Sequence, residues 1–109
     1  MYAIGIPTLN RYDLLKPVLE LYANDHPGVE IHIVDNGHQD IEPLENMTVH
    51  VMATNIGVAA SWNFLLNQIF KKHQFAFILN DDVYSGRKIN EILYFIHHDM
   101  RRNKIGFSV

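Results

Sequence analysis

The chain has 109 residues, 48% of them hydrophobic and 19% charged, which is the balance of one globular domain with one core. Its net charge of −3 argues against a general nucleic-acid binder, which carries a basic face. Because cysteine is absent, disulfides and thiolate zinc sites are excluded. No apolar run approaches a membrane span and the first residues do not resemble a signal peptide, so we expect a cytoplasmic protein.

The first quarter of the chain predicts a strand and a helix. Tyr2–Ile6 is apolar and short, and Pro7 is expected to end its ladder because proline has no N–H. Asn10 and Asp13 have the spacing of a helix-capping pair. Apolar residues then recur at helical spacing: Leu14, Leu15, Val18, Leu19 and Tyr22. Pro17 fits this helix only if it falls in the first turn.

The middle of the chain predicts two strands and a second helix. Val29–Val34 reads as a strand that ends in the turn Asp35-Asn36-Gly37, and a polar loop leads to a third strand over Met47–Met52. A turn follows at Thr54–Gly57. The next helix has an apolar face formed by Val58, Trp62, Leu65, Leu66, Ile69 and Phe70. We expect it to end near Lys71-Lys72, where cations suit the helix dipole.

A buried strand over Phe75–Leu79 runs directly into Asn80-Asp81-Asp82. Ser85 is the expected N-cap of a third helix, whose buried face is Ile89, Ile92, Leu93, Ile96 and Met100. One more strand is predicted over Ile105–Val109, and its exposed edge would favour a homodimer.

Two adjacent carboxylates at the end of a buried strand repel each other and resist desolvation. A divalent cation would relieve both costs, since hard cations prefer carboxylate oxygens. The alternative is an Asp/Asn turn that caps the helix after it. From Asn80-Asp81-Asp82 alone, both interpretations stay open.

Strands that alternate with helices predict the α/β class: a three-layer α/β/α domain with a mostly parallel, Rossmann-like sheet. Ligands of such sheets bind beyond the carboxyl ends of the strands. Four polar segments fall at those ends: Pro7–Arg11, Asp35–Gly37, Asn55–Gly57 and Asn80–Asp82. Their convergence on one edge favours a binding site over a set of unrelated turns.

The chain also resembles a known family through four stretches that come in the family's order. They are Ile4–Arg11, Ile31–Gly37, Thr54–Asn63 and Phe77–Val83. Together they resemble the N-terminal, nucleotide-sugar-binding half of a GT-A glycosyltransferase of the family 2 type. The resemblance implies a donor that is a nucleoside-diphosphate sugar of the UDP, GDP or dTDP type, and Mn²⁺ or Mg²⁺ as cofactor.

The resemblance also assigns roles to particular residues. The first loop, with Pro7, Thr8 and Asn10, would lie against the nucleotide, and Asp35 would contact the base or ribose. The turn with Asn55 and Gly57 would lie beside the donor pocket.

Asn80-Asp81-Asp82 matches the DxD-type motif of this family, with asparagine in the first position. Asp82 would bind the metal that bridges the diphosphate, and Asp81 would lie by the ribose or sugar. Two further side chains are candidate ligand contacts with ordinary alternatives. Arg11 meets phosphate or is an exposed loop arginine, and Asn63 contacts the donor or is a solvated helix residue.

Two departures from the family limit what the resemblance implies. Ala60–Asn63 lacks the basic residue that many relatives carry there. The acid that acts as general base in inverting relatives belongs to a second half that has no match here, so the catalytic residue stays unknown. We therefore expect residues 1–109 to be a single, truncated donor-binding domain that acts on an unknown acceptor. The alternative is a noncatalytic nucleotide-binding module, and an unrelated receiver-like domain ranks last.

Overall fold

The computed structural model of the chain describes residues 1–99 and 107–108. Within these residues the chain forms five strands and three helices. In order they are β1 (Tyr2–Thr8), α1 (Tyr12–Asp25), β2 (Glu30–Asp35), β3 (Met47–Val51), α2 (Gly57–Ile69), β4 (Phe75–Ile78), α3 (Gly86–Asp99) and β5 (Phe107–Ser108). The strand order in the sheet is β3-β2-β1-β4-β5, and each neighbouring pair is parallel. The predicted α/β class with a parallel sheet is confirmed.

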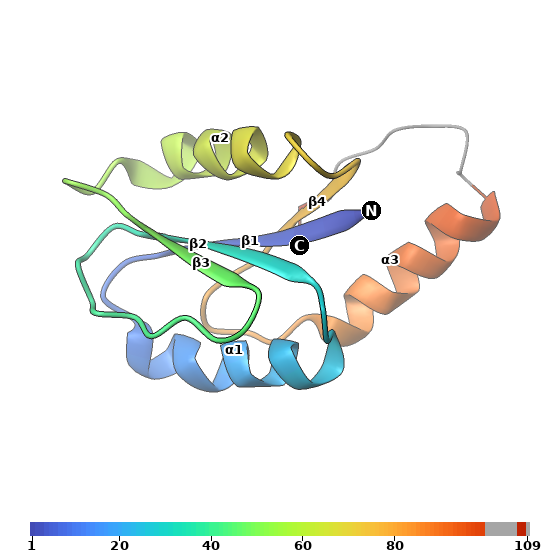
Figure 1. The fold of residues 1–109 in the computed structure, drawn as a ribbon, viewed down its shortest axis with the longest axis horizontal. Coiled ribbons are helices and arrows are strands. Elements are labelled where there is room, and N and C mark those ends of the chain that lie inside the picture. Colours follow the sequence, from blue (N-terminus) through green and yellow to red (C-terminus); the bar gives the residue numbers. More distant parts are fainter. Residues whose placement is uncertain (100–106, 109) are drawn as a thin grey trace.

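Helices cover both faces of the sheet, as Figure 1 shows, with α2 on one face and α1 and α3 on the other. On the α2 face, Leu65 and Ile69 pack with Val34 and other small or branched residues of the strands. On the opposite face, Tyr22 of α1 and Ile89 of α3 belong to the larger apolar cluster. The predicted three-layer α/β/α arrangement is therefore confirmed, with one apolar core on each side of the sheet.

The strand β1 continues through Pro7 to Thr8, so the expectation that Pro7 ends the ladder is wrong. The Gly5 carbonyl accepts a hydrogen bond from the β4 side, and the Thr8 carbonyl accepts one from the β2 side. Since alternate residues of a parallel strand face alternate neighbours, Pro7 faces the β4 side. The β1–β4 ladder has already ended there, at Gly5 and Ile78. The missing N–H of Pro7 therefore costs no ladder hydrogen bond.

The helix α1 begins differently from the prediction. Its N-cap is Arg11, which makes no side-chain capping bond, and Asn10 adopts a left-handed φ of 52°. The predicted Asn10–Asp13 capping pair is therefore wrong. The Tyr12 N–H donates instead to the side chain of Gln39, at 2.8 Å, from the loop after β2. Pro17 lies inside the helix on its exposed side, where water can solvate the carbonyl that the proline leaves without a partner.

The other boundaries lie within a few residues of those predicted. The helix α2 ends at Ile69, so Lys71-Lys72 follow the helix instead of lying in its last turn. Ser85 directly precedes α3, and its carbonyl accepts the Ile89 N–H at 3.0 Å, which starts the helical ladder there.

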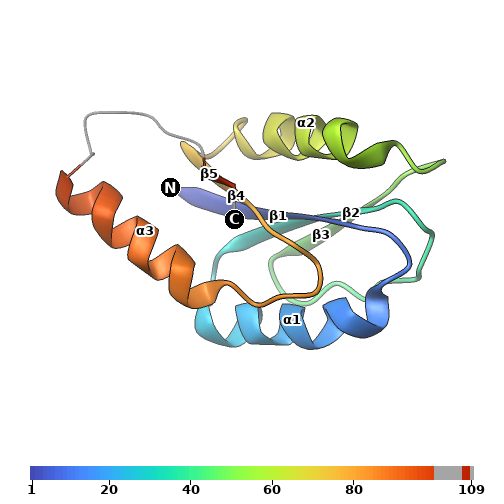
Figure 2. The same ribbon diagram turned by 180° about the vertical axis from the view of Figure 1, so that it is seen from behind.

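The last predicted strand, Ile105–Val109, is described only at β5, which pairs with β4. The rest of that stretch, and Met100 of the predicted helix face, lie outside the described residues. Among the described helices, none has the length and apolar character needed to cross a bilayer. The carboxyl ends of β1, β2 and β3 point to the left in Figure 1 and to the right in Figure 2, toward the start of α1 and α2.

Candidate functional site

A pocket of about 390 Å³ opens at the carboxyl edge of the sheet, and we call it the carboxyl-edge pocket. It is lined by residues at or just beyond the ends of β1, β2, β3 and β4, and by residues of the first half of α2. Seven of the predicted site residues line it: Pro7, Thr8, Arg11, Asn55, Gly57, Asn80 and Asp81. The expectation that polar strand ends converge at this edge is confirmed for these residues.

Asp81 is an acid of the pocket lining that neighbouring side chains hold in place. Its side chain is 12% exposed, and the Thr8 hydroxyl donates to its Oδ2 at 2.9 Å. The guanidinium of Arg11 lies 3.7 Å from Asp81 Oδ1 and donates to Asp82 Oδ2 at 3.0 Å. Arg11 therefore offsets the repulsion between the two neighbouring carboxylates. In the metal-site interpretation of the sequence, a divalent cation has that role.

Asp35 is fully buried and accepts hydrogen bonds from its own loop. The Gly37 N–H donates to Oδ1 at 2.9 Å, and Gln39 donates its backbone N–H to Oδ2 and its side-chain amide to Oδ1. Burial acts to raise the pKa of Asp35, but the hydrogen bonds from Gln39 and Gly37 outweigh it and the pKa is lowered. All of these hydrogen bonds come from the loop after β2, so they do not test the contact of Asp35 with a nucleotide, which stays a prediction.

The start of α2 is held by Asn36, which the sequence predicts only as part of the turn after β2. Asn36 is 8% exposed, accepts the Ile56 N–H at 3.1 Å and donates to the Ser61 hydroxyl at 3.0 Å. Ser61 in turn donates to the Gly57 carbonyl at 2.6 Å. Asn55 accepts the N–H of Gly57, whose φ of 81° is easily adopted only by glycine.

Asn36, Ser61 and Trp62 line the pocket but were not among the predicted site residues. The feature of the sequence that could have identified Asn36 as a pocket residue is its position directly after a strand. Helical periodicity alone predicts a core position for Trp62. It is only partly buried and also packs against the α2-face core, so it borders both the core and the pocket.

Four predicted residues lie outside the pocket lining: Asp35, described above, and Asn10, Asn63 and Asp82. Asp82 directly follows Asp81 in the chain and accepts a hydrogen bond from Arg11, which lines the pocket. Asn63 is exposed on α2. Asn10 packs against Gly37, where an added Cβ would come within 2.5 Å of Asn10 Oδ1. Asn10 thus joins the loops after β1 and β2, and its predicted contact with a nucleotide stays untested.

The acids at this edge fit only a metal that is shared with a ligand. Among the described residues, no three His, Cys, Asp or Glu side chains gather as a metal-binding group. Asp81 and Asp82 supply two carboxylates. Mg²⁺ is commonly held by one or two carboxylates together with substrate phosphates, and this donor set is compatible with that mode.

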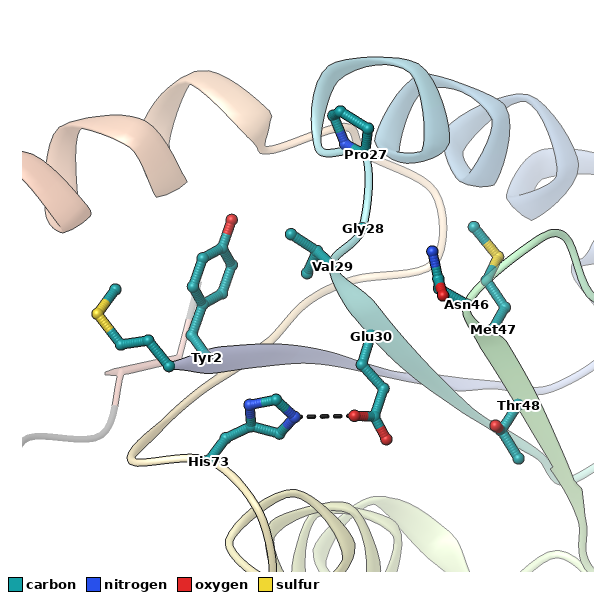
Figure 3. A pocket seen from close by; sticks show the side chains of 10 residues that line it. Tyr2, Pro27, Gly28, Val29, Glu30, Asn46, Met47, Thr48 and His73 are labelled. Atoms are coloured by element: carbon teal, nitrogen blue, oxygen red, sulfur yellow. Dashed lines mark hydrogen bonds and ion pairs between the residues drawn. The ribbon is translucent and has the colours of Figure 1, made fainter.

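A larger pocket of about 530 Å³ lies at the opposite, amino edge of the sheet, and we call it the amino-edge pocket (Figure 3). It contains none of the predicted site residues. Its wall includes Tyr2, Val29 and Glu30, and His73 reaches Glu30 from the segment between α2 and β4. Its volume alone does not make it the functional site, because the strand-end polar residues gather at the other edge.

The two pockets therefore lie at opposite edges of one sheet, and the predicted site residues line only the one at the carboxyl edge. The carboxyl edge combines an anchored acid, an arginine and a helix N-terminus, which suits an anionic ligand that also carries hydroxyl groups. Comparison with protein-family models, with curated proteins and with solved structures found no match to this chain.

Proposed function

We propose that this chain is a GT-A-type domain that binds a nucleoside-diphosphate sugar in the carboxyl-edge pocket for transfer of the sugar to an acceptor. The observation that supports the proposal is that four polar strand ends, each noted in the sequence, line one pocket of about 390 Å³. Small-molecule sites commonly have volumes of about 300–1,000 Å³. The four-stretch resemblance to family 2 glycosyltransferases gives the chemical class of the ligand.

The pocket offers different surfaces to the different parts of such a donor. Trp62 and Leu79 supply apolar wall for a flat base. Arg11 and the positive end of the α2 dipole suit phosphate oxygens, since a helix N-terminus and a guanidinium both favour anions. Asp81, held by Thr8, is placed to accept hydrogen bonds from ribose or sugar hydroxyls.

Asp82, with Asp81 beside it, would hold Mn²⁺ or Mg²⁺ jointly with the diphosphate. When bound, such a cation neutralises charge that develops on a diphosphate leaving group. Arg11 would then exchange its hydrogen bond to Asp82 for one to a phosphate oxygen, because its exposed side chain is free to turn. The proposal assigns no general base to the described residues.

Calorimetry with UDP, GDP and dTDP, each with and without Mn²⁺, tests this proposal. We expect one nucleotide to bind in a Mn²⁺-dependent manner, and Asp82→Asn to weaken that binding by about tenfold or more, equivalent to ~1.4 kcal/mol. Asp40→Asn is the matched control, because Asp40 is an exposed acid outside the pocket. Absence of metal-dependent binding of all three nucleotides, by a chain with a cooperative unfolding transition, would contradict the proposal.

A second candidate is a noncatalytic nucleotide-binding module that needs no metal. The hydrogen bond from Arg11 to Asp82 favours it, because the arginine already balances the acidic pair. This candidate predicts equal nucleotide affinity with and without EDTA, and no turnover of a sugar donor. Sugar transfer or donor hydrolysis that is abolished by Asp82→Ala would exclude it.

A further inference from the structure

Four titratable side chains form one hydrogen-bonded array on the α2 face of the sheet. Glu30 and His32 come from β2, His50 from β3, and His73 from the segment after α2; we call them the histidine–glutamate network. Glu30 Oε1 lies 2.7 Å from His32 Nε2, and Oε2 lies 2.8 Å from His73 Nε2. His32 Nδ1 lies 2.9 Å from His50 Nε2. Figure 3 shows the bond between His73 and Glu30 at the amino-edge pocket.

These contacts fix where the hydrogens must be. An ionised carboxylate only accepts, so the Nε2 atoms of His32 and His73 both donate to Glu30. A neutral His32 then presents a lone pair at Nδ1, and His50 must donate its Nε2–H to it. With all three imidazoles neutral, each of the three contacts contains one hydrogen, and no two donors face each other.

The surroundings of the His32–His50 pair disfavour added charge. His32 is 7% exposed, and the planes of the two rings are nearly parallel, with centroids 5.2 Å apart. Phe64 of α2 packs edge-on against His50, at 5.0 Å. Burial, and then repulsion from His32, lower the pKa of His50. Lys72 is the further charge that acts on Glu30, whose pKa is lowered chiefly by the hydrogen bond from His73, with burial opposing it.

We propose that the histidine–glutamate network is a pH-dependent switch that holds the edge strand β3 against β2 when the His32–His50 pair is neutral. A single added proton can be shared between the two rings beside the negative Glu30. A second proton places an N–H donor on both Nδ1 of His32 and Nε2 of His50, which lie 2.9 Å apart, and makes both rings cationic. That state has no hydrogen bond between the strands' side chains and is repulsive.

The position of His50 makes β3 the element that responds. Among the described strands, β3 lies at the end of the sheet and pairs with β2 alone, so it can separate without breaking the β1–β4 ladder. His50 itself is in register with Val34, one residue before the end of β2. β3 leads directly into the segment with Asn55 and Gly57, so its separation from β2 also loosens that wall of the carboxyl-edge pocket. Glu30 is 30% exposed, which gives solvent protons a path to the network.

Amide hydrogen exchange of the full ¹⁵N-labelled chain, followed from about pH 7.5 to about pH 5, tests the proposal. We expect the protection factors of Thr48, His50 and Met52, whose N–H groups face β2, to fall more steeply as the pH is lowered than those over Ile4–Ile6 in β1. Each additional proton bound by the opened form raises the opening constant about tenfold per pH unit. Ring ¹⁵N shifts, recorded in the same samples, should report Nε2–H tautomers for His32 and His50 at the upper pH.

The decisive variant is His50→Gln, whose amide N–H can still donate to His32 but does not titrate. It should lose most of the pH dependence of β3 protection, whereas His38→Gln, at an exposed loop histidine, should keep it. Equal loss of protection in β1 and β3, or an unchanged pH response in His50→Gln, would overturn the proposal. If the glutamine variant does not fold, the wild-type chain still tests the proposal. The proposal would be overturned if the ring shifts of His32 and His50 changed independently with pH while β3 kept its protection.

Discussion

Thr8 connects the ends of two strands through one hydroxyl group. It is the last residue of β1, it is 3% exposed, and it donates to Asp81 just beyond β4. Asp35 plays a comparable part after β2, where its carboxylate orders the loop that also supplies Gln39 to the start of α1. Single polar side chains at strand ends therefore fix the relative positions of the loops around the carboxyl-edge pocket.

We expect Thr8→Val to destabilise the chain by about 1.5–3 kcal/mol, because it removes a buried hydrogen bond to a charged acceptor and leaves Asp81 less well solvated. Urea unfolding measures the change in the free energy of unfolding. Thr8→Ser keeps the hydroxyl and should lose less stability than Thr8→Val. Equal stability of the two variants would show that the hydroxyl contributes nothing.

At the scale of elements, α2 approaches β1 closely because Gly5 has no side chain. A Cβ added to Gly5 would lie 3.0 Å from Ile78 Cδ1 and 3.2 Å from Leu65 Cβ. Leu65 is fully buried in the core on the α2 face. Glycine inside a strand commonly marks such a close approach.

Gly5→Ala is therefore expected to destabilise the chain by about 1–2 kcal/mol, since overpacking costs more than the gain from a less flexible unfolded chain. The double variant Gly5→Ala/Leu65→Ala should lose less stability than the sum of the single changes, by about 0.5 kcal/mol or more. Denaturant unfolding of the four proteins of this cycle provides the measurement, and strict additivity would contradict a steric cause.

For the whole molecule, buried titratable groups determine how stability depends on pH. Burial lowers the pKa of His26, with Asp25 opposing it, and burial and His32 lower the pKa of His50. In the unfolded chain both histidines regain ordinary values near 6.5 and bind more protons than in the fold. The free energy of unfolding must therefore decrease as the pH falls through that value.

We expect urea unfolding to give the highest stability above about pH 7 and a decline between about pH 6.5 and pH 5. A further decline follows below the ordinary values of 4.5 for Glu30 and 3.8 for Asp35, because both folded pKa values are lowered. His26→Leu should make the slope near pH 6 shallower, since His26 Nε2 is buried without a hydrogen-bond partner in the part of the chain that the structure describes. A flat profile between pH 7 and pH 5 would contradict these assignments.

Local patterns in the sequence determined the class, the order of the elements and the edge where polar residues gather. These features follow from periodicity and from strand-end residues such as Asn55 and Asp81, which act over a few positions of the chain. Only the tertiary structure decided which distant groups meet. Arg11 lies against Asp82, and Gln39 takes over the start of α1 from the predicted pair at Asn10 and Asp13. Such contacts depend on the strand order and register, which no local pattern specifies.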